Sequence, residues 1–180
     1  MRERPGQKRE REVSLKPGFR AQFDRLLTEL TSAVRSVYGD RLVSLVVFGS
    51  VGRGRQRPDS DVDILLVAET LPDGRIPRVC EFGRVDALLE PMLQYLRETG
   101  VTTSVSPVLK TPAEVLQGSL LFLDMTTDAM ILFDRDGFAE KYLGNLASRL
   151  SEMGARKIWR GGSWHWVLKP DYREGEVFDI

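Results

Sequence analysis

Two aspartates are the residues of this 180-residue chain best suited to chemistry. Asp61 and Asp63 open an apolar run, and side chains two positions apart on a β-strand point to the same side. Adjacent carboxylates repel each other unless a cation lies between them. Carboxylate oxygens suit Mg²⁺ or Mn²⁺, especially where substrate phosphates complete the coordination shell. The pair therefore predicts a site for a metal-bound nucleotide.

A Gly-Ser pair stands ten residues before these aspartates, at the end of another apolar run. Gly49 has no side chain to keep a phosphate from the backbone, and Ser50 offers a hydroxyl and an amide donor. Both are candidate nucleotide-binding residues. In the intervening loop, Arg53 could pair with a triphosphate or face water. Ser60 is expected in a turn beside the site, as a further nucleotide contact.

Two strands and a preceding helix should position these groups. The runs 42–48 and 62–67 are apolar and β-branched, as buried strands are, and breakers keep 51–60 in a loop. Apolar residues recur at helical spacing from Phe19 to Val37, with Gly39 just beyond. Further on, the patterns predict a helix over 78–100, with a kink or a break at Pro91, and then a strand over 101–110.

The order Gly49-Ser50, ten residues, Asp61-x-Asp63 resembles the signature of the DNA polymerase β-type nucleotidyltransferase superfamily, above all its minimal nucleotidyltransferases. This resemblance implies an α/β (α+β) nucleotidyltransferase fold, a small mixed β-sheet flanked by helices. It also implies transfer of a nucleoside monophosphate, AMP from ATP before any other nucleoside triphosphate, to a hydroxyl of a protein or small molecule. Asp61 and Asp63 would be catalytic and hold Mg²⁺ or Mn²⁺. Members often pair with HEPN proteins as antitoxin and toxin, so a HEPN-type partner is expected.

A third carboxylate usually completes the metal site in active members of the superfamily. The expected strand 101–110 offers Ser104 and Ser106, and neither is acidic. A rival interpretation treats 84–89 as a strand and makes Asp86 the third ligand, with Glu81 a weaker candidate. Without a third acid, the alternative is a catalytically impaired nucleotide-binding or partner-binding module on the same fold.

Composition narrows the classes of partner. Lys plus Arg equals Asp plus Glu, at 26 each, which argues against a grip on long nucleic acid. The single cysteine, Cys80, excludes a disulfide framework, favours a reduced cytoplasmic setting, and should be an inert thiol, buried or half-buried in its helix. No apolar run approaches the roughly 18 residues of a membrane span, and the charged start lacks the apolar core of a signal peptide.

Three segments are expected: a flexible arm over 1–16, the nucleotidyltransferase domain over 17–154, and a tryptophan-rich hairpin and tail over 155–180, packed on the same domain. Within the domain, the patterns predict helices over 119–133 and 138–153, with Asp124 and Asp128 on one solvated face. All three tryptophans and the only histidine, His165, fall in the hairpin. The tryptophans could close the core, contact a partner or stack a base, and His165 is expected to pack.

Overall fold

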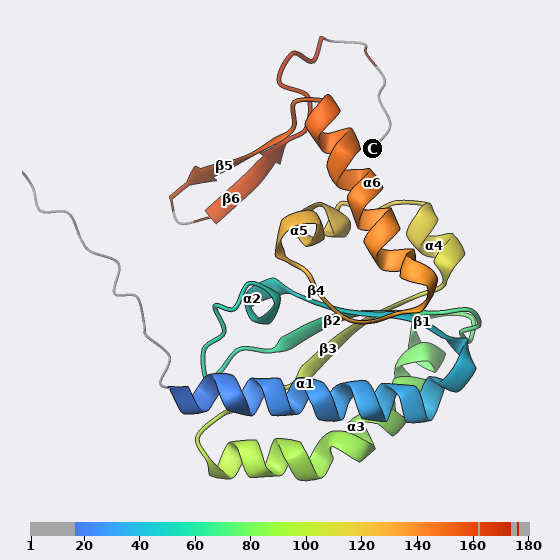
Figure 1. The fold of residues 1–180 in the computed structure, drawn as a ribbon, viewed down its shortest axis with the longest axis vertical. Helices are drawn as coiled ribbons and strands as arrows, with labels where there is room; N and C mark the ends of the chain where they lie inside the picture. Colours follow the sequence, from blue (N-terminus) through green and yellow to red (C-terminus); the bar gives the residue numbers. More distant parts are fainter. Residues whose placement is uncertain (1–16, 162, 174–175, 177–180) are drawn as a thin grey trace, which may run out of the picture.

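A four-stranded mixed sheet runs through the middle of the molecule in the order β3-β2-β1-β4 (Figure 1). The strands are β1 (Leu42–Phe48), β2 (Val62–Ala68), β3 (Val105–Lys110) and β4 (Met130–Asp134). β1 pairs antiparallel with β2 and with β4, whereas β2 and β3 are parallel. The structure is a computed structural model that describes residues 17–161, 163–173 and 176. The arm predicted over 1–16 lies outside these residues.

Helices cover both faces of the sheet (Figure 1). One face carries α1 (Pro17–Tyr38) and α3 (Arg75–Glu98). The other carries α4 (Pro112–Leu116), α5 (Leu121–Asp128) and α6 (Phe138–Glu152). Two 3₁₀ turns, Gly39–Arg41 and Arg135–Gly137, link α1 to β1 and β4 to α6. The mixed sheet flanked by helices agrees with the predicted fold class.

Side chains of β2 alternate between the two faces of the sheet. Ile64 and Leu66 belong to the hydrophobic cluster beneath α1 and α3, whereas Leu65 and Val67 belong to the cluster beneath α5 and α6. This alternation is what a strand buried on both faces requires. Asp63 shares the parity of Leu65 and Val67, so its carboxylate faces the side of the sheet that carries α4, α5 and α6.

The predicted first helix is confirmed, because its apolar stripe lies in the core. Leu26, Leu30 and Val34 are fully buried against the sheet and α3. Gly39 follows with a φ of +52°, a left-handed conformation that suits glycine and ends the helix.

A separate two-stranded sheet follows α6 and extends beside α5 (Figure 1). It consists of β5 (Arg156–Arg160) and β6 (Ser163–Val167), paired antiparallel with Trp159 opposite Trp164. The predicted C-terminal hairpin is thus confirmed. His165 is exposed on it, so the expectation that His165 packs is wrong.

Several local predictions were wrong. The run predicted as one helix over 119–133 ends at Asp128, and Met130 begins β4, because an apolar run this short fits either structure and pairing with β1 decides. Of the two alternatives at Pro91, the break is wrong, because Pro91 lies inside the continuous α3 (Arg75–Glu98). The helix also contains Asp86, so the rival strand over 84–89 is wrong. Cys80 is exposed, not buried. The predicted loop starts with a short helix, α2 (Gly49–Gly52).

The described residues contain no helix long and apolar enough to cross a membrane. The strand predicted over 101–110 begins only at Val105, although Val101 is fully buried.

Candidate functional site

The start of β2 lies beside the end of β1, in the middle of the sheet. Phe48, the last residue of β1, pairs with Asp63 of β2, and the chain then turns directly into α2. Gly49 therefore lies against the Asp63 side chain. Asp61 just precedes β2 and is exposed, whereas Asp63 is half-buried. The structure thus brings together Gly49, Asp61 and Asp63, as the sequence predicts.

Gly49 is required by both its conformation and its surroundings. Its φ is +68°, and a Cβ at this position would stand 2.4 Å from Oδ2 of Asp63. Real Cβ atoms essentially never come this close to another heavy atom, so any side chain would displace the carboxylate. The bare backbone at Gly49 leaves open the space beside the Asp63 carboxylate.

The two carboxylates have no cationic partner within bonding distance in the described part of the chain. Burial raises the pKa of Asp63, the negative charge of Asp61 raises it further, and only the more distant Arg53 acts in the opposite direction. Oδ1 of Asp61 accepts hydrogen bonds from the Ser104 hydroxyl at 2.8 Å and the Ser104 amide at 3.2 Å. The pair is thus held in place but not neutralised.

The other three residues predicted to bind nucleotide interact with other parts of the protein; they are Ser50, Ser60 and Arg53. The Ser50 carbonyl accepts a hydrogen bond from the Arg55 amide, and the Ser60 hydroxyl accepts one from the Arg57 amide, which closes the predicted turn. Arg53 does not face open water. Its Nη1 lies 3.4 Å from Oδ2 of Asp128, and its guanidinium stacks over Trp164.

Asp63 opens onto a pocket of about 790 Å³ between α3, β3 and the start of α4. Phe48, Ser106 and Asp86 also line it. Ser106 pairs with Asp63 in register, at the place where the superfamily resemblance calls for an acid. Burial raises the pKa of Asp86. Glu81, the weaker candidate, is instead ion-paired with Arg41 at 2.7 Å.

The donor set fits a divalent cation shared with phosphate. Asp61 and Asp63 offer hard oxygen ligands beside an open backbone. Burial raises the pKa of Asp63 most, the charge of Asp61 raises it further, and a bound cation would favour the ionised form. The described residues contain no cluster of three or more His, Cys, Asp or Glu able to hold a metal. Asp86 therefore does not complete a three-carboxylate site with the pair.

A second acid pair, Asp124 and Asp128 of α5, holds the C-terminal hairpin. Oδ1 of Asp124 accepts hydrogen bonds from the indole nitrogens of Trp164 and Trp166 at 3.0 and 2.9 Å. Lys157 lies 3.0 Å from Asp124 and 3.1 Å from Asp128. The expectation that these acids form a solvated face is therefore wrong.

The role of Lys157 was not predicted from the sequence. The available signal was an acid pair spaced four residues apart on α5, facing a later strand with alternating lysine and tryptophan. Hydrogen bonds from the hairpin lower the pKa of Asp124. Burial alone would raise its pKa, but bonds from Trp166, Lys157 and Trp164 outweigh burial and lower the pKa.

The amino-acid sequence is similar to a known protein family and to a named protein of that kind. A family model described as a nucleotidyltransferase domain matches residues 27–112, which contain the Gly49 turn and both aspartates. A protein of Methanocaldococcus jannaschii, provisionally named a protein adenylyltransferase, is 32% identical over 123 residues. That match covers 67% of this chain and 78% of the relative.

Solved structures give more distant likenesses. A crystal structure of a toxin-antitoxin with AMP-PNP has a TM-score of 0.43 and 20% identity, over 71% of this chain and 92% of the other. A complex of tri-AMPylated Shewanella oneidensis HEPN toxin with MNT antitoxin has a TM-score of 0.40 and 16% identity, over 73% of this chain and 92% of the other.

Proposed function

This chain belongs to the nucleotidyltransferase domain family, and we propose that it transfers a nucleoside monophosphate, AMP from ATP, to a hydroxyl of an acceptor protein. The observation that carries the proposal is the Asp61 and Asp63 pair, which lies beside the bare backbone of Gly49. No cationic side chain among the residues that the structure describes is bonded to this pair. The protein adenylyltransferase name of the M. jannaschii relative supports both AMP and a protein acceptor.

Each residue near the pair has an assigned role. Asp61 and Asp63 would hold Mg²⁺ or Mn²⁺ together with the triphosphate, and the bound metal would neutralise charge on the leaving pyrophosphate. Gly49 and Ser50 would bind the β- and γ-phosphates. Arg53, whose charge already acts on Asp63, would stabilise the triphosphate from the side of α2. Ser60 holds the turn that delivers Asp61 and could contact the nucleotide.

The acceptor enters through the pocket that Asp63 and Asp86 share. Among the described residues Asp86 forms no metal-binding cluster with the pair, but it lines the same pocket as Asp63. We therefore assign it to proton transfer: its carboxylate would take the proton of the attacking hydroxyl. A HEPN-type protein is the acceptor that the family resemblance suggests. A small-molecule acceptor is the second choice, since a pocket of about 790 Å³ could hold one.

A specific observation favours a second candidate, a nucleotide-binding module that does not transfer. Ser104 donates to Asp61, and Ser106 stands opposite Asp63, so two serines occupy the position expected of a third acid. Such a module would bind Mg²⁺ and nucleotide and act through a partner protein. The reduced cytoplasmic setting indicated by the single cysteine stays a prediction in either case.

A transfer assay tests the proposal. The full chain would be incubated with each α-labelled nucleoside triphosphate, Mg²⁺ and a purified HEPN-type protein, with Asp61→Asn/Asp63→Asn as control. We expect label from ATP on the acceptor, and none with the control. Mg²⁺-dependent nucleotide binding without transfer would favour the module instead. If the unmodified chain shows neither transfer nor Mg²⁺-dependent nucleotide binding, both functions are contradicted.

A further inference from the structure

A second pocket, of about 390 Å³, lies between the loop after α2, the end of α5 and the hairpin. We call it the tryptophan pocket. Of the candidate site residues, only Arg53 lines it. The lining is otherwise contributed by three segments far apart in the sequence: Gly52 and Arg55, then Thr127, Asp128 and Ala129, then Lys157, Trp159 and Trp164.

Positive charge is in excess around the tryptophan pocket. Three cations, Arg53, Arg55 and Lys157, line it together with one carboxylate, that of Asp128, which lies 3.4 Å from Arg53 and 3.1 Å from Lys157. Lys157 also pairs at 3.0 Å with Asp124, which does not line the pocket, so three cations meet two carboxylates. Arg55 is exposed, and within residues 17–161, 163–173 and 176 its side chain makes no hydrogen bond or ion pair. The pocket therefore has a guanidinium available for an anion, and its walls carry net positive charge.

The aromatic groups of the pocket differ in how firmly they are engaged. Trp164 is fixed by the bond from its indole nitrogen to Asp124, and cations lie over its ring, Arg53 at 5.0 Å and Lys157 at 5.4 Å. Trp159 leans on Trp164, with ring centroids 5.0 Å apart, yet is 61% exposed. Trp164 is thus held in place, and Trp159 presents open ring surface next to it, close to the guanidinium of Arg55.

We propose that the tryptophan pocket binds a nucleotide, with the base stacked on Trp159 and a phosphate paired with Arg55. A nucleotide combines a flat base, which stacks on aromatic side chains, with an anion that guanidinium pairs well. The pocket volume lies within the roughly 300–1,000 Å³ of small-molecule sites. An acidic peptide would use the arginines but would leave the open face of Trp159 without a flat partner.

The proposal goes beyond the proposed function, because this nucleotide needs neither Asp61 nor Asp63 nor a metal. The two sites are linked through Arg53, which lines the tryptophan pocket and also acts on the charge of Asp63. A phosphate in the tryptophan pocket would therefore lie next to the triphosphate site. The nucleotide could be free or could be the end of an RNA strand.

Intrinsic fluorescence gives a direct readout, since every tryptophan of the chain is in the hairpin. The full chain in EDTA would be titrated with AMP, and we expect saturable quenching. Trp159→Ala and Arg55→Ala should each weaken AMP binding at least about fivefold, the low end of the loss measured for one stacked base. Calorimetry supplies the affinity of Trp159→Ala, which lacks one fluorophore, and circular dichroism checks its fold.

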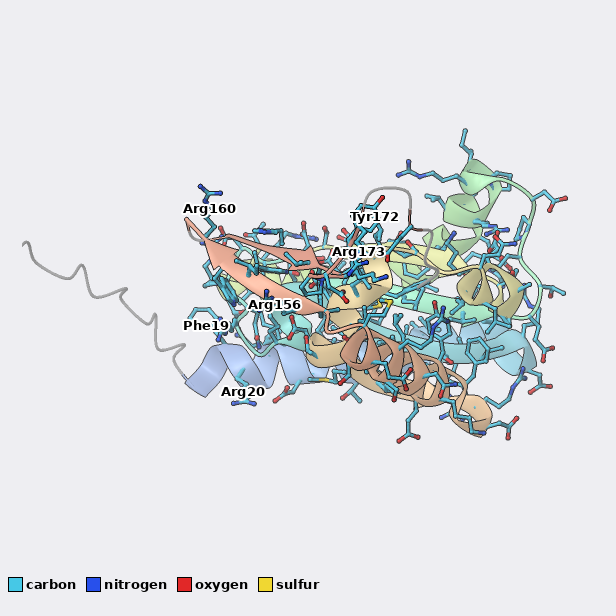
Figure 2. The ribbon with its side chains drawn as sticks, turned by 90° about the horizontal axis from the view of Figure 1, so that it is seen from above. Phe19, Arg20, Arg156, Arg160, Tyr172 and Arg173 are labelled. Carbon is cyan, nitrogen blue, oxygen red and sulfur yellow. The ribbon has the colours of Figure 1, made fainter. Side chains whose placement is uncertain are left out.

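Arg156→Ala is the matched control for Arg55→Ala. Arg156 lies on β5 with Trp159, but strand alternation puts it on the opposite face, away from the pocket. Figure 2 shows Arg156 and Arg160 on this strand, with Arg160 at the free end of the hairpin. The Arg156→Ala variant loses the same charge and should bind AMP like the unmodified chain.

Ligand controls identify what is recognised. Ribose 5-phosphate, which lacks the base, should bind at least about fivefold more weakly than AMP. If penta-adenylate binds more tightly than AMP, the proposal holds and the nucleotide is the end of an RNA strand. If it binds equally or more weakly, the proposal holds and the ligand is a free nucleotide. Equal binding of ribose 5-phosphate or of a Glu-rich peptide would overturn it.

Two results with protein variants would also overturn the proposal. One is AMP binding that survives Trp159→Ala unchanged. The other is AMP binding in EDTA that disappears in Asp61→Asn/Asp63→Asn, because the signal would then come from the catalytic site. Neither result depends on whether label is transferred from ATP, so the failure of this proposal is distinguishable from failure of the proposed function.

Discussion

The molecule contains two aspartate pairs that the same fold treats in opposite ways. Asp124 and Asp128 accept bonds from Lys157, and Asp124 also from two indoles, so the pKa of each is lowered although burial alone would raise it. Asp61 and Asp63 have no bonded cation within the described residues, and burial together with the Asp61 charge raises the pKa of Asp63. Within the described residues, the first pair is neutralised by a lysine of the protein, and the second is not; in the proposed function a bound Mg²⁺ or Mn²⁺ takes that role.

The presence or absence of a bonded cation distinguishes structural aspartates from candidate catalytic aspartates better than residue type alone does. Asp124 and Asp128 would be as good a metal site by residue type and spacing, yet Lys157 occupies the position a metal would take. The protein gives up stability at Asp63, where the unneutralised charge is costly, and gains it where the hairpin is attached.

Of the changes that test the contrast between the two aspartate pairs, substitution of Gly49 should have the largest effect. Gly49→Ala would force Oδ2 of Asp63 away from a Cβ placed 2.4 Å from it, and transfer should fall on the order of 100-fold, as for a misplacement of about 1 Å. Gly54→Ala is the matched control: its φ of +66° gives the same backbone strain, and no atom lies within 4 Å of its Cβ. Equal losses of transfer in both variants would contradict this account of Gly49.

A smaller effect is expected when the hairpin loses its anchor. Asp124→Ala removes the acceptor of two indole donors and one partner of Lys157, which should cost about 1–3 kcal/mol of unfolding free energy. Thermal unfolding by circular dichroism would follow it, and tryptophan fluorescence should shift to the red. Asp59→Ala removes only an exposed ion pair with Arg57 and should change stability little. A stable Asp124→Ala with unchanged fluorescence would show that Asp124 does not hold the hairpin.

The smallest effect is a pair of pH dependences with opposite signs, measured by thermal unfolding without metal. The pKa of Asp63 is raised in the folded state, so its ionisation destabilises the fold as pH rises through that pKa. Asp63→Asn should therefore unfold about 1–3 °C higher than the unmodified chain at neutral pH, with no difference below about pH 4.

The pKa of Asp128 is lowered, so its contribution is present at neutral pH and lost as pH falls below about 4. Asp128→Asn should unfold lower than the unmodified chain at neutral pH, and the two should converge in acid. Shifts of the same sign for Asp63→Asn and Asp128→Asn would remove the distinction between the pairs.

The parts of the site that follow from neighbouring residues could be predicted from the sequence. Gly49, Asp61 and Asp63 sit at the ends of two strands joined by a short loop, and local patterns specify strands, loop and the face the acids share. The helix with Asp86 was likewise favoured by its apolar stripe.

Features that depend on distant contacts could not be predicted. Asp124 meets Trp164 and Trp166 across 40 and 42 residues, and no local pattern specifies that packing. Met130 is a strand residue because β1 offers it an open edge, although its own sequence fits the preceding helix. Asp86 lines the pocket of Asp63 because α3 packs against β3, and only the assembled fold determines that contact.

The most direct test of the central claim is calorimetry of Mg²⁺ with a non-hydrolysable ATP analogue, on two matched double variants. The Mg²⁺-dependent part of binding should weaken at least about 100-fold in Asp61→Asn/Asp63→Asn, on the order reported for disturbed metal sites. It should stay within a few-fold of the unmodified chain in Asp124→Asn/Asp128→Asn. Unchanged Mg²⁺-dependent binding in the first variant, or equal loss in both, would show that the Asp61 and Asp63 pair is not the metal–nucleotide site.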